Sequence, residues 1–475
     1  MNTDFEPVIG LEVHVQLNTK TKIFCGCSTK FGLLPNTSIC PVCLGYPGVL
    51  PVMNEEVVRS AVKVCLMMDF MINTYSRMDR KNYFYPDLPK GYQISQFDNP
   101  IGVKGKLSID TDEGKKEIGI TRIHIEEDAG KLIHGDGVSY VDFNRTGVPL
   151  LEIVSEPDIR SSKEAYLYLK KLKQILEYTK ISDCNMEEGS LRCDANVSIR
   201  PKGQAQFGTK TEIKNLNSFK FVQKALDYEI ERQMNVLKEG GTISQETRLF
   251  DSGTGKTKTM RSKEEAHDYH YFPEPDLLPI MVSEGMIKEA TFSLPEKPDD
   301  KCARFEKQYG LPAYDASVLT ADPSTADYYE ECAKFCSNYK MISNWMMGEW
   351  LRELNERSVS AVDSPVLAKD LAGLLNMIEN GKISGKIAKE IFPEMVKTGK
   401  TAEQIVQEKG LTVISDTGAI ETMIKEVLGK NEKSVQDYKN GKKGVLGFLI
   451  GQVMKASKGK ADPKKVNELM EKILS

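Results

Sequence analysis

Residues 117–158, EIGITRIHIEEDAGKLIHGDGVSYVDFNRTGVPLLEIVSEPD, decide the fold that we expect for this chain. Two strand-like runs lie in this stretch, separated by turns rich in glycine. In VPLLEIV, residues 148–154, apolar residues occupy both alternating positions, which is typical of a strand buried on both faces. Glu152 stands in the middle of this run, where an unpaired carboxylate would be costly. It therefore needs a partner, and the stretch leaves open whether this is a bound cation or the side chain of Arg145.

The composition is that of a globular protein with more than one domain. The chain has 475 residues, of which 40% are hydrophobic and 28% charged, with a formal net charge of -4. This length favours about two to four domains. The longest apolar runs, residues 64–68 and 445–450, are far shorter than the ~20 residues of a membrane helix. The N-terminal MNTDFEP lacks the features of a secretory signal. We therefore expect a cytoplasmic protein that does not engage a membrane.

A further strand is predicted near the N-terminus. Odd positions from residue 9 to 17 are apolar, whereas Glu12 and His14 stand at even positions. This period of two predicts one buried face and one face that presents the carboxylate beside the imidazole. Such a pair suits a shared hard cation or proton transfer. A half-exposed edge strand without chemistry would show the same pattern, so both interpretations stay open.

Four cysteines form two close pairs. Cys25 and Cys27 are followed, after twelve residues, by Cys40 and Cys43. In a chain expected in the cytosol, this spacing matches a tetrahedral structural zinc site, and free buried cysteines are the alternative. Four thiolates leave no open coordination position, so zinc would support the fold of the loop at 25–43.

Aromatic and basic side chains alternate in residues 77–93, RMDRKNYFYPDLPKGYQ. A loop of this kind, constrained by proline and glycine, could stack on bases and pair with phosphates. A rigid loop packed on its own tyrosines is the alternative.

Several predicted strands carry acids on a polar face. In LRCDANVSIR, residues 191–200, apolar and polar positions alternate around Asp194, and TKTEIKNLNS, residues 209–218, places Glu212 among lysines. The acids offered by the strands are Glu12, Glu126 or Glu127, Glu152, Asp194 and Glu212. Converging acids repel one another unless cations separate them, and oxygen ligands with one histidine suit magnesium, manganese or calcium.

Two further features bear on this pocket. Neighbouring Glu126 and Glu127 point to opposite sides of a regular strand, so either the strand ends or bulges there, or only one of them faces the pocket. Basic residues lie among the acids and add capacity to bind phosphate, namely Arg145, Arg192, Lys210 and Lys214. Magnesium with basic residues around it is the usual equipment for phosphoryl transfer from a nucleotide.

Helical periodicity replaces the strand patterns from about residue 295. Helices are expected at residues 326–354, 366–379, 383–391 and 402–408, with a final helix from Pro463. Trp345 and Trp350 are expected in the core of this region. Residues 441–475 hold eight lysines against three acids, which suggests contact with an RNA backbone, although a solvated surface would have the same composition.

A series of motifs, in order over about residues 5–280, carries a resemblance to a known family. They are IGLEVHVQL, KNYFYPDLPKGYQISQ, HIEEDAGK, DFNRTGVPLLEIVSEPD, EEGSLRCDANVSIR, EIKNLNSF and HDYHYFPEPDLLP, with a weaker match in GKKGVLGFLIGQVMKASKGKADPKKV. Together they resemble the B subunits of the tRNA-dependent amidotransferases. These enzymes make Gln-tRNA(Gln) or Asn-tRNA(Asn) from misacylated Glu-tRNA(Gln) or Asp-tRNA(Asn). The resemblance implies that the chain uses ATP to phosphorylate the side-chain carboxylate, which ammonia then attacks.

The resemblance also implies roles for particular residues. By this resemblance, the catalytic residues, which are one histidine and six acids, are ligands of two magnesium ions. The first ion would be held by His14, Glu127 and Glu152, and the second by Glu12, Glu126, Asp194 and Glu212. The basic residues Arg145, Arg192, Lys210 and Lys214 would then bind ATP, and zinc would be structural. The other cysteines have no evident histidine partner, so ammonia is expected from glutamine through an amidase-type A subunit, bridged by a small C subunit in a heterotrimer.

We therefore expect an α+β catalytic domain of the cradle type with a mostly antiparallel sheet, followed by all-α helical and tail domains. The kinase-like catalytic domain is placed at residues 1–293, the helical domain at 294–405 and the tRNA-binding tail at 406–475. Two other hypotheses remain: a non-catalytic RNA-binding scaffold whose acids form salt bridges, and a ligase for a small carboxylic acid, which leaves the basic tail without a task.

Overall fold

The computed structural model describes residues 4–262, 269–411, 417–457, 461 and 463–474. His267 and Asp268 of the HDYHYFPEPDLLP motif lie outside these residues, as do Lys458 and Lys460 of the basic tail. The chain divides into two compact units, Met1–Lys297 and Pro298–Ser475.

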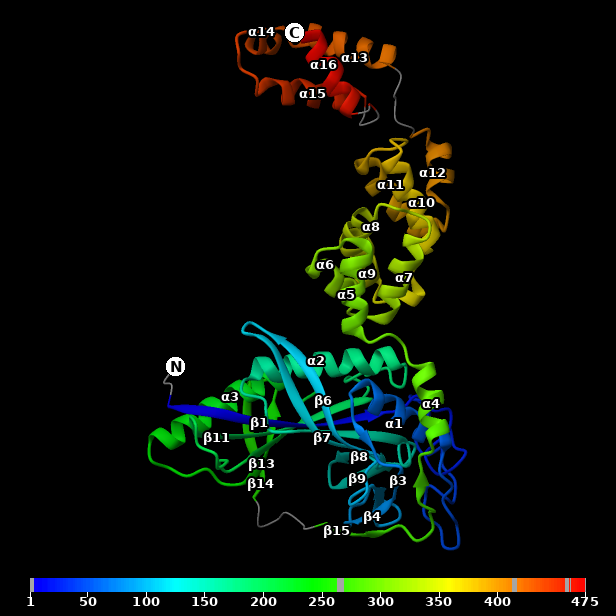
Figure 1. Cartoon of the computed structure of the whole chain (residues 1–475), viewed down its shortest axis with the longest axis vertical. Coiled ribbons are helices and arrows are strands. Elements are labelled where there is room, and N and C mark those ends of the chain that lie inside the picture. The colour runs from blue at the N-terminus through cyan, green and yellow to red at the C-terminus, as the bar shows by residue number, and fades with distance from the viewer. Residues whose placement is uncertain (1–3, 263–268, 412–416, 458–460, 462, 475) are drawn as a thin grey trace. The chain divides into compact units, whose positions relative to one another are not determined.

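A nine-stranded sheet forms the centre of the first unit (Figure 1), with the strand order β14-β13-β12-β11-β1-β10-β7-β6-β2. Neighbouring strands are antiparallel, apart from the parallel pair β12 and β13. The expected α+β fold with a mostly antiparallel sheet is therefore confirmed. The strands are β1 (Phe5–Gln16), β2 (Met71–Ile72), β6 (Gly102–Thr111), β7 (Gly114–Glu127), β10 (Pro149–Ser155), β11 (Leu191–Pro201), β12 (Thr211–Lys214), β13 (Glu246–Asp251) and β14 (Lys256–Ser262).

β1 lies in the middle of this sheet, between β10 and β11. The edge-strand interpretation is therefore wrong. Its odd-numbered residues from Ile9 to Val15 are buried and its even-numbered ones are partly exposed, as the alternation predicts. β10 is buried throughout except at Val154, which agrees with the prediction of a strand buried on both faces.

Helices cover one face of the sheet. α1 (Glu55–Met67) packs on β7, α2 (Ser162–Thr179) on β6, and α3 (Phe219–Lys238) on β11. Each begins where a side chain accepts a hydrogen bond from the first turn, at Asn54, Ser161 and Ser218. These helices share one hydrophobic core with the odd-numbered residues of β1. The even-numbered residues of β1 therefore face away from the helices.

Three smaller sheets and one helix complete the first unit. They consist of β4 (Asp79–Asn82), β5 (Tyr92–Ser95) and β15 (His270–Pro273) in one sheet, β3 (Tyr75–Ser76) with β16 (Ile280–Met281), β8 (Lys131–Gly135) with β9 (Val138–Asp142), and α4 (Glu284–Ser293). The stretch at residues 77–93 thus contains two paired strands, β4 and β5, rather than a loop alone.

The second unit is helical wherever it is described, as expected. Its helices are α5 (Pro298–Tyr309), α6 (Ala313–Leu319), α7 (Pro323–Ala333), α8 (Tyr339–Trp345), the π-helix Met346–Trp350, α9 (Leu351–Arg357), a short 3-10 helix (Ala361–Asp363), α10 (Ala368–Glu379), α11 (Gly385–Thr398), α12 (Ala402–Lys409), α13 (Thr417–Lys430), α14 (Glu432–Lys439), α15 (Val445–Ala456) and α16 (Pro463–Leu474). One hydrophobic core extends from Phe305 to Val406 and another from Ile420 to Leu474. Among the described residues, no helix has the length and apolar character needed to cross a bilayer.

Some helix boundaries differ from those predicted. The pattern at 326–354 is divided into α7, α8, the π-helix and α9. α11 passes through Pro393, because Met395 continues its buried face beyond the predicted end at residue 391. The expected domain boundary at 405 falls inside α12, whose Ile405 and Val406 pack in the core of the preceding helices. Trp345 and Trp350 are buried there, as predicted.

Candidate active site

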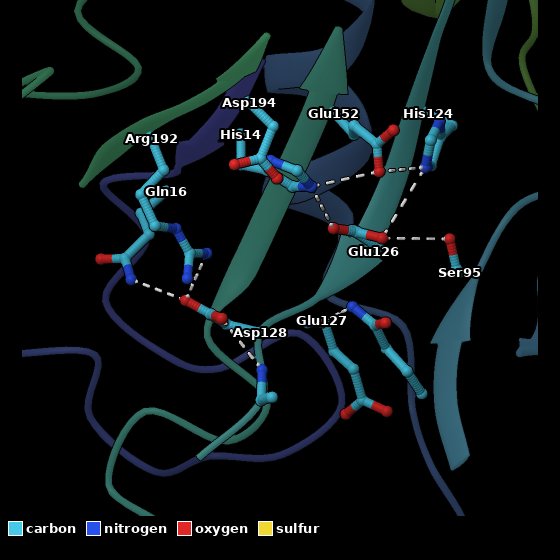
Figure 2. Close-up of polar contacts among 12 residues, drawn as sticks. His14, Gln16, Ser95, His124, Glu126, Glu127, Asp128, Glu152, Arg192 and Asp194 are labelled. Carbon is cyan, nitrogen blue, oxygen red and sulfur yellow. Dashed lines mark hydrogen bonds and ion pairs between the residues drawn. The ribbon is translucent and has the colours of Figure 1, made fainter. Parts of the chain in front are cut away.

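A row of polar side chains crosses four neighbouring strands on the face away from the helices. His14 of β1 lies opposite Arg192 of β11 and opposite Glu152 of β10, and Glu152 lies opposite His124 of β7. Directly opposite residues of antiparallel strands project from the same face. The register of four strands thus brings together residues that are far apart in the sequence, as Figure 2 shows.

His14, Glu126 and Glu152 lie close enough to hold one metal ion. One donor atom from each lies within 4.8 Å of the others. His14 Nε2 is 3.2 Å from Glu152 Oε2 and 3.5 Å from Glu126 Oε1. Both carboxylates are buried. Two carboxylates and one imidazole suit a divalent ion such as magnesium or manganese, which would also relieve the repulsion between the acids.

Arg145 is not the partner of Glu152. Its guanidinium donates to the backbone carbonyl oxygens of Ala129 and Gly130 and lies 3.6 Å from Asp128. Histidines surround Glu152 instead, since His124 Nε2 lies 3.2 Å from Glu152 Oε2, as His14 does. The interpretation of Glu152 as an ion pair with Arg145 is therefore wrong.

His124 is a member of the cluster that the sequence interpretation missed. Its Nε2 also lies 3.7 Å from Glu126 Oε2, and its buried Nδ1 has no hydrogen-bond partner among the described residues. Burial works against its charge, but the carboxylates of Glu152 and Glu126 raise the pKa of His124 to about 9. Burial likewise works against the charge of Glu152, but the two histidines hold its pKa well below the usual range. The two histidines therefore favour the ionised form of Glu152, which is the form that binds a cation.

Glu127 lies apart from His14 and Glu152. Both of its carboxylate oxygens accept from Lys90 Nζ, at 2.5 and 2.6 Å, and one also accepts from the backbone N–H of Ile94. Figure 2 shows its side chain directed away from the cluster. The structure thus joins Glu126, rather than Glu127, to the other two residues of the first expected ligand set. Both possibilities raised for this pair hold, because β7 ends at Glu127 and only Glu126 of the two faces the cluster.

The remaining acids of the second expected set lie on β1, β11 and β12. Glu12 is opposite Asp194 of β11, and Glu212 of β12 is opposite Asn196. Lys214 Nζ lies 2.5 Å from Asp194 and 2.9 Å from Glu212. Burial, together with Glu152, Asp194 and Glu212, raises the pKa of Glu12. This part of the face therefore carries an excess of negative charge next to the first cluster.

Three of the four basic residues expected to bind ATP contact acids. Arg192 donates to Asp128 at 2.9 Å, Arg145 is near the same carboxylate, and Lys214 bridges two acids. Burial opposes ionisation of Asp128, but the two arginines lower its pKa overall. Lys210 is exposed, just before β12.

The four cysteines of the predicted zinc site come together, with one Sγ atom from each within 4.8 Å of the others: Cys25, Cys27, Cys40 and Cys43. Tetrahedral zinc with Zn–S bonds of about 2.3 Å would place the sulfurs about 3.8 Å apart, so the donor set fits this metal. A hydrogen bond from Cys25 is the main cause that lowers the pKa of the Cys43 thiol to about 4, and it raises the pKa of Cys25. The ammonium of Lys22, which is fully buried, lies 3.7 Å from Cys43 Sγ.

A cavity of about 80 Å³ lies beside this cysteine loop. Cys25 and Cys43 line it together with Lys90, Tyr92 and Glu127. The cavity therefore lies between the cysteine loop and the ion pair of Lys90 with Glu127, and His14, Glu126 and Glu152 are not among its lining residues.

Comparisons with known proteins agree along the whole chain. The family model described as the GatB/GatE catalytic domain matches residues 7–288, and the model described as the GatB domain matches residues 327–474. The chain is 57% identical over 472 residues to the B subunit of the aspartyl/glutamyl-tRNA(Asn/Gln) amidotransferase of Carboxydothermus hydrogenoformans, covering 98% of each chain. It is 58% identical over 476 residues to the protein of the same name from Geotalea uraniireducens, covering 99% of each chain.

Proposed function

The chain belongs to the family of aspartyl/glutamyl-tRNA(Asn/Gln) amidotransferase B subunits, and from this premise we propose that it activates misacylated tRNA with ATP. The substrate is the side-chain carboxylate of Glu-tRNA(Gln), Asp-tRNA(Asn) or both. The observation that carries the proposal is the cluster of His14, Glu126 and Glu152, whose donors fit a divalent ion on the polar face of the sheet.

Activation is needed because a carboxylate is a poor electrophile. In the first step, a carboxylate oxygen of the substrate attacks the γ-phosphorus of ATP, the bond from that phosphorus to the β,γ-bridging oxygen breaks, and ADP leaves. In the second step, ammonia attacks the carbonyl carbon of the acyl phosphate. The carbon–oxygen bond to phosphate breaks, inorganic phosphate leaves, and the nitrogen loses a proton to give the amide.

The chain's own residues are proposed to position these groups. His14, Glu126 and Glu152 would hold one magnesium ion, and Glu12, Asp194 and Glu212 would hold a second. The metal would supply charge stabilisation for the transferred phosphoryl group. His124 contacts both Glu126 and Glu152 and would orient them, since partners of metal ligands fix ligand geometry.

The roles of the basic residues follow from their contacts. Arg192 and Arg145 share Asp128 and would form the cationic wall of the site. Lys214 would release Asp194 and Glu212 to a second ion and turn to phosphate. Lys210 is exposed and would contact phosphate from the loop before β12. The cysteine loop would hold zinc as a structural support.

Partners are part of the proposal. Ammonia would come from glutamine through an amidase-type A subunit, with a small C subunit completing a heterotrimer in the cytoplasm. The basic C-terminal segment would contact the tRNA backbone.

The test uses the reconstituted heterotrimer and both misacylated tRNAs. Glu126→Gln and Glu152→Gln should each lower tRNA-stimulated ATP cleavage by about a hundredfold or more, as expected for loss of charge stabilisation at a phosphoryl group. Glu117→Gln is the matched control, because Glu117 lies on the same strand as Glu126 but its side chain is 58% exposed. Without glutamine, label from the γ-phosphate should appear on the aminoacyl group of the tRNA. Full ATP cleavage by both cluster variants would contradict the proposal.

A further inference from the structure

Lys81 is a basic residue near the cluster that has no role in the function proposed so far. It lies on β4, opposite Gln93 of β5 and opposite Tyr271 of β15. Gln93 and Ser95 project from one face of β5 because they are two residues apart. Ser95 Oγ donates to Glu126 at 3.3 Å, and Gln93 Nε2 donates to the backbone oxygen of Glu127 at 2.7 Å. Lys81, being opposite Gln93, therefore projects from the face of the small sheet that meets the acidic cluster.

Aromatic rings hold the ammonium group of Lys81. Its Nζ lies 4.7 Å from the ring centroid of Tyr269 and 5.8 Å from that of Tyr83. These contacts are cation–π interactions, which fix the position of a cation without neutralising it. Among the described residues, no carboxylate lies within 4.0 Å of Lys81 Nζ. Burial disfavours its charge, but Glu126, Glu152 and the tyrosines more than offset this and raise the pKa of Lys81.

Other basic residues around the cluster are engaged differently. The amine of Lys90 contacts Glu127, that of Lys214 contacts Asp194, and the guanidinium of Arg80 contacts Glu274. To bind phosphate, each of these would have to leave a close carboxylate. Lys81 has no such carboxylate among the residues that the structure describes. It is also half-buried beside the cluster, where an incoming anion is strongly stabilised by a cation held in place.

We propose that Lys81 binds an oxygen of the γ-phosphoryl group of ATP and follows that group to the substrate carboxylate. The assignment rests on the phosphoryl transfer proposed above and adds the residue that recognises the transferred group. Lysine suits this role as a point charge with three donors on a flexible stem. Lys81 forms no covalent bond and keeps its proton in both steps, so it acts by charge and hydrogen bonding alone.

The experiment compares nucleotide binding by the heterotrimer carrying Lys81→Met, Lys81→Gln or Lys81→Arg. Two probes are used, each with manganese: ADP, and the β,γ-imido analogue of ATP. Loss of one charge-assisted hydrogen bond should weaken the triphosphate analogue about ten- to hundredfold in both neutral variants and ADP by less than about threefold. Lys81→Arg should recover most of the preference for the triphosphate analogue over ADP. Lys106→Met is the control, because Lys106 lies in the same unit on β6 and its side chain is 50% exposed.

The results separate the possible roles of Lys81. An equal loss for the analogue and ADP in both neutral variants would overturn the proposal, because Lys81 would then only shape the pocket or balance the acids. The proposal would also be overturned if both neutral variants kept the wild-type preference for the triphosphate analogue over ADP. Thermal unfolding of each variant shows whether it is folded, and two neutral variants guard against the failure of one. If wild-type protein and Lys106→Met bound neither nucleotide, the proposed function itself would fail.

Discussion

One step along β7 separates two glutamates in different environments. Glu126 lies among histidines and another acid, whereas Glu127 is paired with Lys90 on the other side of the strand. The first arrangement can bind a metal ion, but its carboxylates repel one another when no ion is bound. The second is a buried ion pair that holds β7 to the segment containing Lys90. Substitution of each residue should therefore change a different property.

We predict that Glu126→Gln weakens manganese binding without destabilising the metal-free protein, because it removes one of several mutually repelling acids. Glu127→Gln should instead lower the free energy of unfolding by about 3–5 kcal/mol, because it leaves the ammonium of Lys90, whose side chain is only 10% exposed, unpaired. Manganese titration and thermal unfolding measured on both variants check this. A double variant with Lys90→Met should be more stable than Glu127→Gln alone; if it is less stable, the pairing is not the cause.

Lys22 should slow the release of zinc from the four-cysteine site. Its ammonium donates to the carbonyl oxygens of Ser38 at 2.8 Å and Phe143 at 3.3 Å, next to Cys43. Lys22→Met removes a buried positive charge from a site with four thiolates, so we expect faster loss of zinc to a coloured chelator and a lower melting temperature. Lys20→Met is the control, because this lysine is exposed two residues earlier. Equal zinc release from the two variants would argue against this role.

At the scale of elements, close packing of β6 depends on glycine. A Cβ atom added to Gly105 would lie 2.6 Å from ring atoms of Phe70, which is buried. Gly105→Ala should therefore lower the free energy of unfolding by about 1–3 kcal/mol. Far-UV circular dichroism during heating measures this effect. Adding Phe70→Leu should recover part of the loss, and Gly285→Ala, with only Ser283 Oγ nearby at 3.6 Å, should show none.

A buried carboxylate links two helices of the second unit by hydrogen bonds. Asp315 of α6 is buried and accepts hydrogen bonds from Lys340 and Ser343 of α8. Burial opposes its charge, but these two donors lower its pKa below the usual value. Its contribution to stability is therefore present above the unfolded-state pKa of about 3.9 and is lost as the pH falls through the lower folded-state pKa.

Asp315→Asn should accordingly destabilise this core by about 1–3 kcal/mol at pH 7, and the difference from wild type should shrink below about pH 4. Urea unfolding followed by tryptophan fluorescence is the suitable measurement, because both tryptophans of the chain lie in this core. A difference that stayed constant from pH 7 to pH 3 would show that the charge is not responsible.

The elements were more predictable than their contacts. Alternation alone identifies β1 and β11, and an unbroken apolar run identifies β10. The same parity argument could have revealed His124, because it is two residues from Glu126 on β7 and shares its face. That Glu126 rather than Glu127 joins His14 depends on the pairing of β7 with β10 and on Lys90, which is 37 residues away in sequence. Such long-range register is not encoded in local periodicity.

The basic residues illustrate the same limit. Arg145, Arg192 and Lys214 were expected to bind phosphate from their composition and position, but the folded chain brings each of them to an acid. Whether a basic side chain is already engaged depends on tertiary contacts. In the second unit, the interruption between α7 and α8 did have a local signal, since Asn338 caps α8.

At the scale of the molecule, the described residues form three hydrophobic cores, and different functions are expected of the segments around them. The first contains the sheet with the candidate site, and the last belongs to the segment rich in lysine. We predict that replacing Lys442, Lys443 and Lys455 together by glutamine weakens tRNA binding and flattens its dependence on salt, because fewer counterions are released. Nucleotide binding should be unchanged.

Binding of misacylated tRNA to the heterotrimer at several salt concentrations measures this effect. The matched control replaces three exposed lysines of the first unit, Lys20, Lys104 and Lys115, by glutamine. If the control flattened the salt dependence as much as the tail variant, binding would reflect overall charge and not the C-terminal segment.

The central position of β1 constrains how the protein can be made. β1 ends at residue 16, yet its two neighbours end at residues 155 and 201. At about 5–20 residues per second, a ribosome needs roughly 10 to 40 s to add the second neighbour. β1 lacks both neighbours until residue 155 has been added and still lacks β11 until residue 201, so the nascent chain offers a chaperone an unpaired apolar strand that is covered once the sheet closes.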